Sequence, residues 1–394
     1  MMKGMCVIMK LKLAVVTILM LTVVCTIMFP LRIFASGETL LSSLSLDCVS
    51  AILMEAETGT VLYEQNADQA LPPASVTKIM TLLLTMEALE SGEIKLDDML
   101  VCSANAAAMG GSQVYLEEGE QMSVEDLIKC VVICSANDAA VVLSEAIAGS
   151  EEEFVSQMNQ RAKELGMTNT AFENTNGLDD TAVNHVSSAR DIAIMSRELI
   201  KHDKILQYSS LWMDSIRNGE FGLTNTNRLV RFYPGATGLK TGSTSKAKFC
   251  ISATAKRNGM HLICVIMGAD TRDIRNSSAT RLLDWGFANY SLYQDLMSLT
   301  NNQISVSGGV DDRVTIAAQK FCCVIPKGAE NKIVKSLNVP VNLSAPILEN
   351  ASIGSVRYNL EDKFLGETPI VTLSAVDKIE FKQVLFRIFL SFMI

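Results

Sequence analysis

The segment Ser75-Val76-Thr77-Lys78 puts a hydroxyl and an amine three residues apart, directly after Pro72-Pro73-Ala74. Prolines just before an apolar-rich stretch mark a helix start, so Ser75 is expected at or near the first turn of a helix that continues through residues 76–89. Side chains three residues apart lie on one face of a helix. The segment therefore predicts a serine nucleophile beside an amine that accepts its proton.

Histidine, the usual base for a serine nucleophile, occurs only as His185, His202 and His261, and none of them lies in a triad or nucleophile-elbow signature. Lysine can replace histidine only if burial or a second positive charge lowers its pKa. The apolar residues after the first segment predict such burial. We interpret His185 as a packed loop residue that precedes a capping box of Ser188 and Asp191.

Two further segments belong with the first, Ser135-Ala136-Asn137 and Lys240-Thr241-Gly242. The resulting order, S-x-x-K, S-x-N and K-T-G, is close to the motif set of β-lactamases and penicillin-binding proteins. Those proteins transfer acyl groups without a catalytic histidine. The combination predicts an acyl-transfer site in which the Ser135 hydroxyl and the Asn137 amide support the nucleophile and its base.

The Lys240 segment is predicted to open an edge strand, followed by two more strands at residues 249–255 and 261–267 that are joined by a hairpin turn. A substrate that ends in a carboxylate would meet the Lys240 ammonium and the Thr241 hydroxyl. The ammonium would also help to keep Lys78 neutral, because like charges disfavour each other.

Gly242 and Ser243 are expected to shape the opposite side of the site. A glycine in an edge strand lets a substrate backbone approach closely. The backbone N–H of Ser243 would then donate, together with that of Ser75, to the oxyanion that forms during acyl transfer. The backbone of two distant segments is thus predicted to surround one substrate carbonyl.

Single motifs also occur by chance in this chain. Residues 243–246 and 245–248 fit S-x-x-K, and Ser103-Ala104-Asn105 repeats the Ser-Ala-Asn pattern. The copy at 135–137 follows an apolar segment, whereas the copy at 103–105 is interpreted as a strand end that enters a short helix and a turn. The flanking residues alone leave the choice between the two copies nearly open. The order of the three motifs is the specific signal.

The chain resembles the serine-type D-alanyl-D-alanine carboxypeptidases, which are low-molecular-mass penicillin-binding proteins. Beyond the three motifs, the likeness includes residues 51–63, 174–191 and 225–229, and it favours the Ser-Ala-Asn copy at 135–137. It implies an α/β (α+β) transpeptidase fold of the penicillin-binding and β-lactamase type. In that fold an antiparallel sheet is flanked by helices, and a small C-terminal all-β domain follows.

The resemblance also implies a role for each matching position. Ser75 would be the acylated residue and Lys78 its proton acceptor, Ser135 and Asn137 would relay protons and position the substrate, and Lys240 would bind the terminal carboxylate. The implied reaction removes the C-terminal D-Ala from peptidoglycan stem pentapeptides through a serine acyl-enzyme. β-Lactams are implied as covalent ligands, and no cofactor or metal ion is implied.

Other functions are possible on the same fold: a β-lactamase, a D,D-endopeptidase or transpeptidase, or a catalytically silent wall-binding protein. A class A β-lactamase needs a glutamate that activates the deacylating water. The usual Glu-x-x-Leu-Asn pattern does not occur between Ser135 and Lys240. The intact motif set argues against a silent protein. Arg228 is a candidate second partner for the substrate carboxylate.

The beginning of the chain has the pattern of an export signal. Residues 1–35 hold four basic residues and no acidic one, residues 13–29 are uncharged, and Ala35-Ser36-Gly37 follows. We predict a signal peptide at 1–36, with an uncleaved anchor as the alternative, and hence action at the extracytoplasmic face of the bacterial membrane and in the cell wall. The formal net charge of −9 argues against a nucleic-acid partner.

Composition predicts three further parts: a catalytic domain at residues 40–295, a β-domain at 298–375 and a helix at 376–394. Within the β-domain, alternating apolar residues predict short strands at 304–306, 314–316, 339–341 and 370–373. Gly308-Gly309 and Asn350 are turn signals between them. No chemistry is predicted for this domain.

The last helix carries one narrow polar stripe on an otherwise apolar surface. Four residues at intervals of 3, 4 and 4 make the stripe: Glu380, Gln383, Arg387 and Ser391. Such a helix is predicted to lie on a membrane surface with its stripe toward water. A helix that docks on the β-domain is the alternative. The segment is too short and too interrupted to be assigned as a membrane span.

The ten cysteines lie mostly in apolar runs, which is typical of buried thiols rather than of a disulfide framework. Cys130 and Cys134 are four residues apart, but no matching pair stands at the spacing of a zinc site. We therefore expect mostly reduced thiols and no metal centre.

Overall fold

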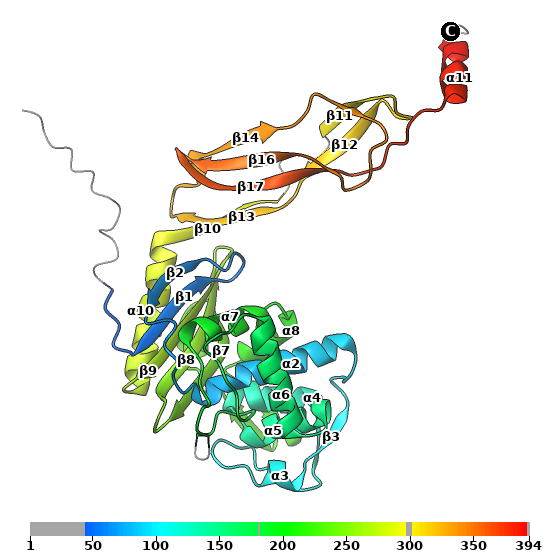
Figure 1. Ribbon diagram of the computed structural model, residues 1–394. Helices are drawn as coiled ribbons and strands as arrows, with labels where there is room; N and C mark the ends of the chain where they lie inside the picture. The colour runs from blue at the N-terminus through cyan, green and yellow to red at the C-terminus, as the bar shows by residue number, and fades with distance from the viewer. Residues whose placement is uncertain (1–43, 180–181, 297–301, 392–394) are drawn as a thin grey trace, which may run out of the picture. The chain divides into compact units, whose positions relative to one another are not determined.

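The computed structural model describes residues 44–179, 182–296 and 302–391. The predicted signal peptide, residues 1–36, lies outside the described residues. Within them, no helix combines the length and the apolar character that a membrane crossing requires. The described chain forms an α+β region that contains the three motifs, followed by an all-β region (Figure 1).

A five-stranded antiparallel sheet, in the order β2-β1-β9-β8-β7, is the centre of the first region. Its strands are β1 (Ser50–Glu55), β2 (Val61–Gln65), β7 (Ala236–Thr244), β8 (Lys248–Arg257) and β9 (Met260–Ala269). Asn258 and Gly259 both adopt positive φ between β8 and β9, as a tight hairpin turn requires. The predicted hairpin is confirmed, and β7 is an edge strand as expected.

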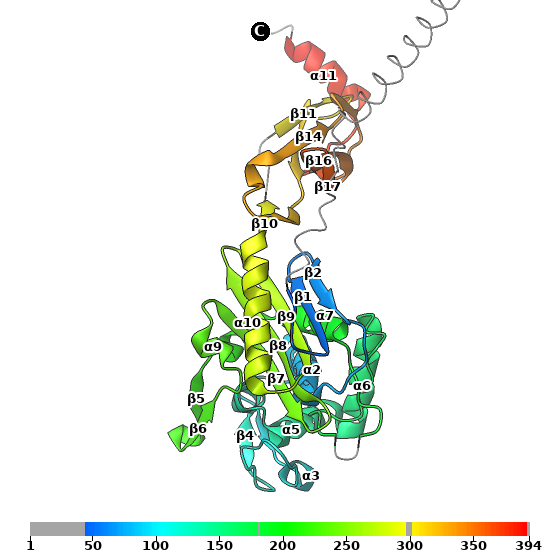
Figure 2. The same cartoon turned by 90° about the vertical axis from the view of Figure 1, so that its left-hand side faces the viewer.

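Helices cover both faces of this sheet, which explains why β8 and β9 are buried in nearly continuous runs. Helix α10 (Arg272–Asn289) packs on β8 and β9 from one side, and α7 (Ala189–Leu199) packs on β1 and β9 from the other (Figure 2). The Ser188 hydroxyl accepts a hydrogen bond from the Asp191 N–H and so begins α7. The Asp191 carboxylate accepts hydrogen bonds from the Asn169 N–H and the Thr170 hydroxyl. Only the Ser188 half of the predicted capping box is therefore observed.

The remaining elements of this region surround α2 (Lys78–Ser91), whose residues are buried on almost all sides. They are η1 (Ala74–Thr77), β3 (Met99–Val101), α3 (Ala104–Ala107), β4 (Gln121–Ser123), α4 (Val124–Lys129), η2 (Cys130–Cys134), α5 (Asn137–Ala148), α6 (Glu151–Glu164), α8 (Asp203–Ser209), β5 (Met213–Ile216), η3 (Arg217–Gly219), β6 (Phe221–Thr224) and α9 (Leu229–Phe232). Because α2 carries Lys78 at its first position, this packing buries the lysine as predicted.

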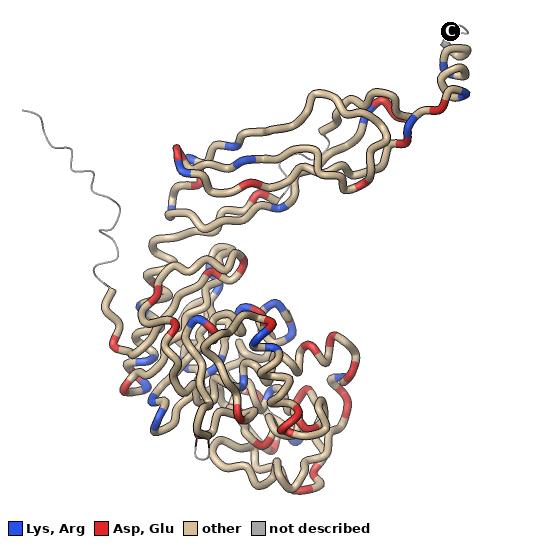
Figure 3. Tube along the Cα trace, viewed as in Figure 1, with Lys and Arg blue, Asp and Glu red and all other residues tan. Residues whose placement is uncertain are grey.

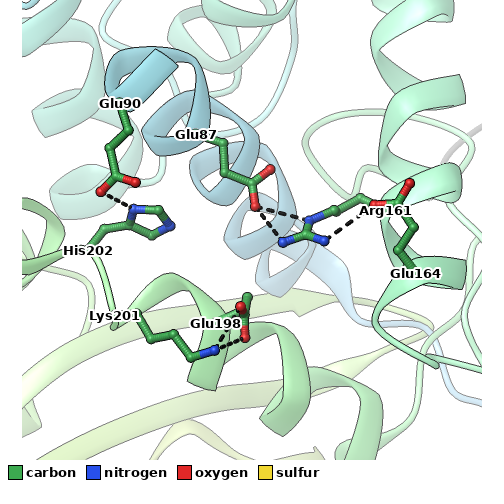
Figure 4. A network of polar contacts seen from close by, with 7 residues as sticks. All are labelled: Glu87, Glu90, Arg161, Glu164, Glu198, Lys201 and His202. Atoms are coloured by element: carbon green, nitrogen blue, oxygen red, sulfur yellow. Dashed lines mark hydrogen bonds and ion pairs between the residues drawn. The ribbon is translucent and has the colours of Figure 1, made fainter. Parts of the chain in front are cut away.

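Polar contacts tie the exposed edge of α2 to its neighbours (Figure 4). Arg161 of α6 donates to Glu87 from both Nε and Nη2, at 3.0 and 2.7 Å, and His202 Nδ1 lies 2.7 Å from Glu90. Both acidic and basic residues occur in this region (Figure 3). Such exposed pairs contribute about 0–1 kcal/mol each, so the apolar core of α2 is the larger stabilising factor.

The second region is the predicted all-β domain. A six-stranded sheet has the order β14-β16-β17-β12-β11-β15, and a separate pair joins β10 to β13. The strands are β10 (Tyr290–Asp295), β11 (Asn302–Ser307), β12 (Arg313–Ala318), β13 (Phe321–Pro326), β14 (Ile333–Asn338), β15 (Asn342–Ser344), β16 (Ser352–Leu360) and β17 (Lys363–Thr372), with η4 (Glu330–Lys332) before β14. Tyr358 is fully buried and stacks on Phe321 with ring centroids 3.9 Å apart.

One predicted strand of this domain is wrong. Residues 339–341 form the connection between β14 and β15, because Pro340 has no N–H to donate to a strand ladder. The final helix, α11 (Phe381–Ser391), occupies only part of the predicted range. It begins late because Val376 and Lys378 form β-bridges with Ile347 and Gly309.

Candidate active site

The nucleophile segment begins in η1 rather than in the α-helix itself, which differs from the expectation. Ala74 adopts φ +49, so regular helix begins only at Lys78. The 3-10 turn nevertheless brings the predicted pair together, since Lys78 Nζ lies 3.1 Å from Ser75 Oγ. The hydroxyl and the amine therefore meet as the spacing predicts.

Lys78 is fully buried, and two oxygen atoms besides Ser75 surround its amine. Nζ lies 2.6 Å from Asn137 Oδ1 and 2.7 Å from the Asn176 carbonyl oxygen, and both atoms can only accept hydrogen bonds. A neutral amine has two N–H groups and one lone pair. With both N–H groups donated to these oxygens, the lone pair is left for the Ser75 hydroxyl.

Burial, followed by the nearby charge of Lys240, lowers the pKa of Lys78 well below its ordinary value. The orientation of Asn137 is fixed as well, because its Nδ2 donates to the Gly110 carbonyl at 2.7 Å. Its oxygen must therefore face the lysine. The geometry and the electrostatics both favour the neutral form of the Lys78 amine.

Ser135 ends η2 in the left-handed conformation, with φ +68, and only Ala136 separates it from α5. Its Oγ is buried and forms no hydrogen bond to the rest of the described protein. A buried hydroxyl without a partner costs about 1–3 kcal/mol and calls for an explanation. Ser135 lines the same cavity as Ser75, so this hydroxyl is available to a bound substrate.

On β7, Lys240 is buried and its Nζ donates to the Thr241 carbonyl at 2.9 Å. Burial lowers the pKa of Lys240 to about 7. The Thr241 hydroxyl donates to Thr226 at 2.8 Å, and Ser243 is exposed at the cavity. The two lysines are therefore both desolvated, but only Lys78 has two acceptors besides a hydroxyl.

Gly242 is required for a reason that the sequence did not reveal. A Cβ at this position would lie 2.8 Å from the Ser75 nitrogen and 2.9 Å from the Pro73 oxygen. The glycine thus lets β7 lie directly against the protein's own nucleophile turn, which adds to the predicted reason of a close substrate approach. Ser75 and β7 share one wall of the cavity because of this contact.

The cavity has a volume of about 700 Å³. It is lined by five of the eight predicted site residues, Ser75, Ser135, Thr241, Gly242 and Ser243, and also by Arg228. Lys78 and Asn137 lie behind this lining and reach it through Ser75. Lys240 is buried behind Thr241 on the same strand. The structure thus brings the three motifs to one cavity.

Sequence reasoning missed Arg275 and Arg272 of α10, and also Trp212 and Phe232, which all line the cavity. Arg275 is buried, its side chain donates only to Asn276 Oδ1 among the described residues, and burial beside Arg272 lowers its pKa to about 10. The signal in the sequence was a charged residue on the sheet-facing side of a helix. Within the described chain, no acidic residue lines this cavity.

The decoy motifs lie elsewhere in structural roles. Ser103 caps α3 by accepting from the Ala106 N–H at 3.0 Å, and Asn105 donates to Glu145 at the surface. Lys246 is exposed and donates to the Asp179 carbonyl. The structure therefore places the Ser-Ala-Asn copy at 135–137, and not the one at 103–105, beside Lys78.

Ser75 lines a cavity that also holds cationic side chains and an edge strand, and the desolvated amine of Lys78 lies directly behind it. Such an arrangement is typical of a serine acyl-transferring enzyme. Residues 38–271 match the D-alanyl-D-alanine carboxypeptidase family, and residues 287–378 match the C-terminal domain of penicillin-binding protein 5. The chain belongs to the D-alanyl-D-alanine carboxypeptidase family. The predicted family, fold class and serine-type carboxypeptidase activity are confirmed.

Similar proteins cover most of the chain. D-alanyl-D-alanine carboxypeptidase DacF of Bacillus subtilis is 41% identical over 348 residues, which are 86% of this chain and 88% of that protein. DacC of Escherichia coli is 35% identical over 88% of each chain. The crystal structure of penicillin binding protein 5 from Haemophilus influenzae superposes with a TM-score of 0.74 at 31% identity, over 85% of this chain and 98% of that one.

The contact between Gly242 and the nucleophile turn predicts the effect of Gly242→Ala. The added methyl group must push β7 and η1 apart, and a displacement of about 1 Å near a reacting group lowers rates on the order of 10²-fold. We expect kcat/KM for D-Ala release to fall to that extent, and the melting temperature to fall as well, because overpacking costs about 1–3 kcal/mol. Gly222→Ala is the matched control, since nothing lies within 4 Å of its added Cβ. Full activity of Gly242→Ala would contradict the steric argument.

Proposed function

We propose that Ser75 is the residue acylated by the substrate and that Lys78 is the base that activates it. Ser75 Oγ attacks the carbonyl carbon of the bond between the last two D-Ala residues of a peptidoglycan stem pentapeptide, while its proton passes to Lys78 Nζ. The observation that carries this proposal is the amine of Lys78, whose two N–H groups have acceptors and whose lone pair faces Ser75. No second base is needed for that step.

The later steps use the remaining cavity residues. The oxyanion accepts hydrogen bonds from the backbone N–H groups of Ser75 and Ser243. Ser243 lies on β7, the edge strand of the sheet, which has one unpaired side. The C–N bond then breaks, and the leaving amine of D-Ala takes the proton from Lys78 through the Ser135 hydroxyl. Water hydrolyses the resulting ester by the same path in reverse, which releases the shortened peptide and restores Ser75.

Cationic groups at one end of the cavity would hold the free carboxylate of the substrate. Lys240 and Thr241 approach it from β7, and Arg275 approaches it from α10 with only a neutral amide as its partner among the described side chains. Arg228 also lines the cavity. A carboxylate that replaces water between these groups would favour the charged form of Lys240.

Ser75→Ala tests the nucleophile assignment. Mass spectrometry of the intact protein after exposure to penicillin should show one covalent adduct that maps to Ser75, and the variant should show none and release no D-Ala. Ser245→Ala, in the decoy segment, should keep both properties. A Ser75→Ala protein that still forms the adduct would contradict the proposal, and rapid turnover of the wild-type adduct would instead favour a β-lactamase.

The two lysines predict a bell-shaped pH profile of kcat/KM, which reports the free enzyme. The rate should rise with pH as Lys78 loses its proton, and fall above about pH 7 as Lys240, whose pKa is about 7, loses the charge that binds the carboxylate. The same peptide with a C-terminal carboxamide has no carboxylate for Lys240 to bind. It should be cleaved slowly, and its kcat/KM should lack the alkaline limb, the fall on the high-pH side of the profile. An alkaline limb that is identical for both peptides would contradict the role of Lys240.

We propose further that the protein acts outside the cytoplasm, attached to a membrane surface through α11. The helix α11 exposes six large apolar side chains: Phe381, Leu385, Phe386, Ile388, Phe389 and Leu390. The polar side is partly engaged by the β-domain, since Arg387 donates to Asp312 Oδ1 at 3.3 Å and to the Val310 carbonyl. An exposed apolar face of this kind is stabilised by insertion into the boundary of a bilayer.

Sedimentation with vesicles of phosphatidylcholine and phosphatidylglycerol tests this attachment, in a chain that begins at residue 37. The double variant Phe386→Ser/Phe389→Ser should partition on the order of 10²- to 10⁴-fold less, because each buried phenylalanine contributes about 1.5–3 kcal/mol. Phe364→Ser removes a phenylalanine of comparable exposure from β17 and should bind as the wild type does. Unchanged binding of the double variant would contradict the role of α11.

A further inference from the structure

The residue before the nucleophile has an unusual backbone conformation. Ala74 adopts φ +49, in the left-handed region that residues with a Cβ rarely enter. Such strain persists only where the surrounding structure fixes it, and it is concentrated at functional sites. The conformation of this one residue sets the direction of both the Ser75 N–H and the Ser75 side chain.

Two glycines from distant segments enclose the turn. A Cβ on Gly177 would lie 1.9 Å from the Ala74 carbonyl oxygen, and a Cβ on Gly242 would lie 2.8 Å from the Ser75 nitrogen. The turn is therefore in close contact with the 174–178 segment and with β7. These contacts limit how far the turn can move, but neither of them holds the Ala74 carbonyl by a directed bond.

A chain of three hydrogen bonds supplies that directed bond. The Glu173 backbone N–H lies 3.0 Å from His185 Nδ1, His185 Nε2 lies 2.7 Å from Thr77 Oγ1, and Thr77 Oγ1 lies 2.8 Å from the Ala74 carbonyl oxygen. A backbone N–H can only donate, so Nδ1 must be an acceptor and the proton is on Nε2. Nε2–H then donates to Thr77, and the only hydrogen of the Thr77 hydroxyl is left for Ala74.

The surroundings keep this chain intact. Thr77 is fully buried, His185 is 6% exposed, and Phe172 contacts the imidazole edge-on. The charged groups that act on the imidazole are Glu173, Asp179 and Lys78. The two carboxylates raise the pKa of His185, but burial lowers it by more, so that this pKa falls to about 4. The ring is thus neutral under physiological conditions.

The His185 loop is also anchored to the approach of the nucleophile segment. Leu71 and Ser187 exchange two backbone hydrogen bonds, at 2.8 and 2.9 Å. The imidazole therefore reaches Thr77 from a loop that is paired with the chain four residues before Ser75. The loop, the hydroxyl and the strained carbonyl form one connected unit.

We infer that His185 and Thr77 are positioning residues which, through the Ala74 carbonyl, hold Ser75 in its reactive orientation. The inference rests on the proposed role of Ser75, which it deepens. Neither side chain touches the substrate. Their effect is expected in the rate of the covalent step, because a small rotation of the Ala74 peptide moves both the nucleophile and an oxyanion donor.

Thr77→Val tests the inference in the full chain, because valine keeps the shape and removes the hydroxyl. Labelling with a fluorescent penicillin separates the acylation rate constant from the dissociation constant of the preceding complex. We expect the rate constant to fall about 10- to 100-fold, with the dissociation constant within threefold of wild type. Thr77→Ser keeps the hydroxyl and should restore the rate, and His185→Phe should reproduce the loss.

Thr85→Val is the matched control. Thr85 is equally buried in α2, and its hydroxyl donates to the Thr81 carbonyl at 2.7 Å, far from the turn. It should lower the melting temperature as Thr77→Val does and leave the acylation rate unchanged. A normal rate in Thr77→Val, or an equal loss in Thr85→Val, would overturn the inference. Absence of any Ser75 adduct in the wild type would overturn the proposed function and the inference with it.

Discussion

The desolvated amine of Lys78 is the constraint on which the rest of this structure depends. A lysine removed from water is stabilised as the neutral base, and the protein provides two acceptor oxygens for its N–H groups, from Asn137 and Asn176. These oxygens belong to α5 and to the 174–178 segment, while the lysine itself begins α2. Three separate parts of the chain must therefore pack correctly before the amine can face Ser75.

The packing that achieves this leaves several groups in unfavourable states. Ala74 and Ser135 have left-handed backbone conformations without being glycine, the Ser135 hydroxyl lacks a partner among the described residues, and two lysines are buried. Each feature lowers stability in isolation. They occur together around one cavity, and the apolar core around α2 offsets their cost. This concentration of strain is itself an argument that the cavity is the reactive part of the molecule.

The sequence predicted the side chains of the site better than their surroundings. Motifs name residues, so Ser75 and Lys78 could be paired from their spacing alone. The Asn176 carbonyl could not be predicted, because any residue supplies a carbonyl and only the path of the backbone places it. Arg275 was missed because β8 and β9 separate it from β7 along the chain. Only the fold shows that its side chain lines the same cavity. For the same reason the contact between Gly242 and the nucleophile turn emerged only from packing.

The two buried lysines carry opposite roles in the proposed reaction, and their surroundings explain how one protein can hold both. Lys78 has acceptors that suit a neutral amine, whereas Lys240 lies with Arg275 beside the cavity without an acidic partner among the described residues that line it. A substrate carboxylate would supply the missing negative charge and favour the ammonium form of Lys240. That ammonium in turn disfavours a charge on Lys78. Binding of the substrate would therefore complete the electrostatics that keep the base neutral, so that activation of Ser75 is coupled to occupation of the carboxylate site.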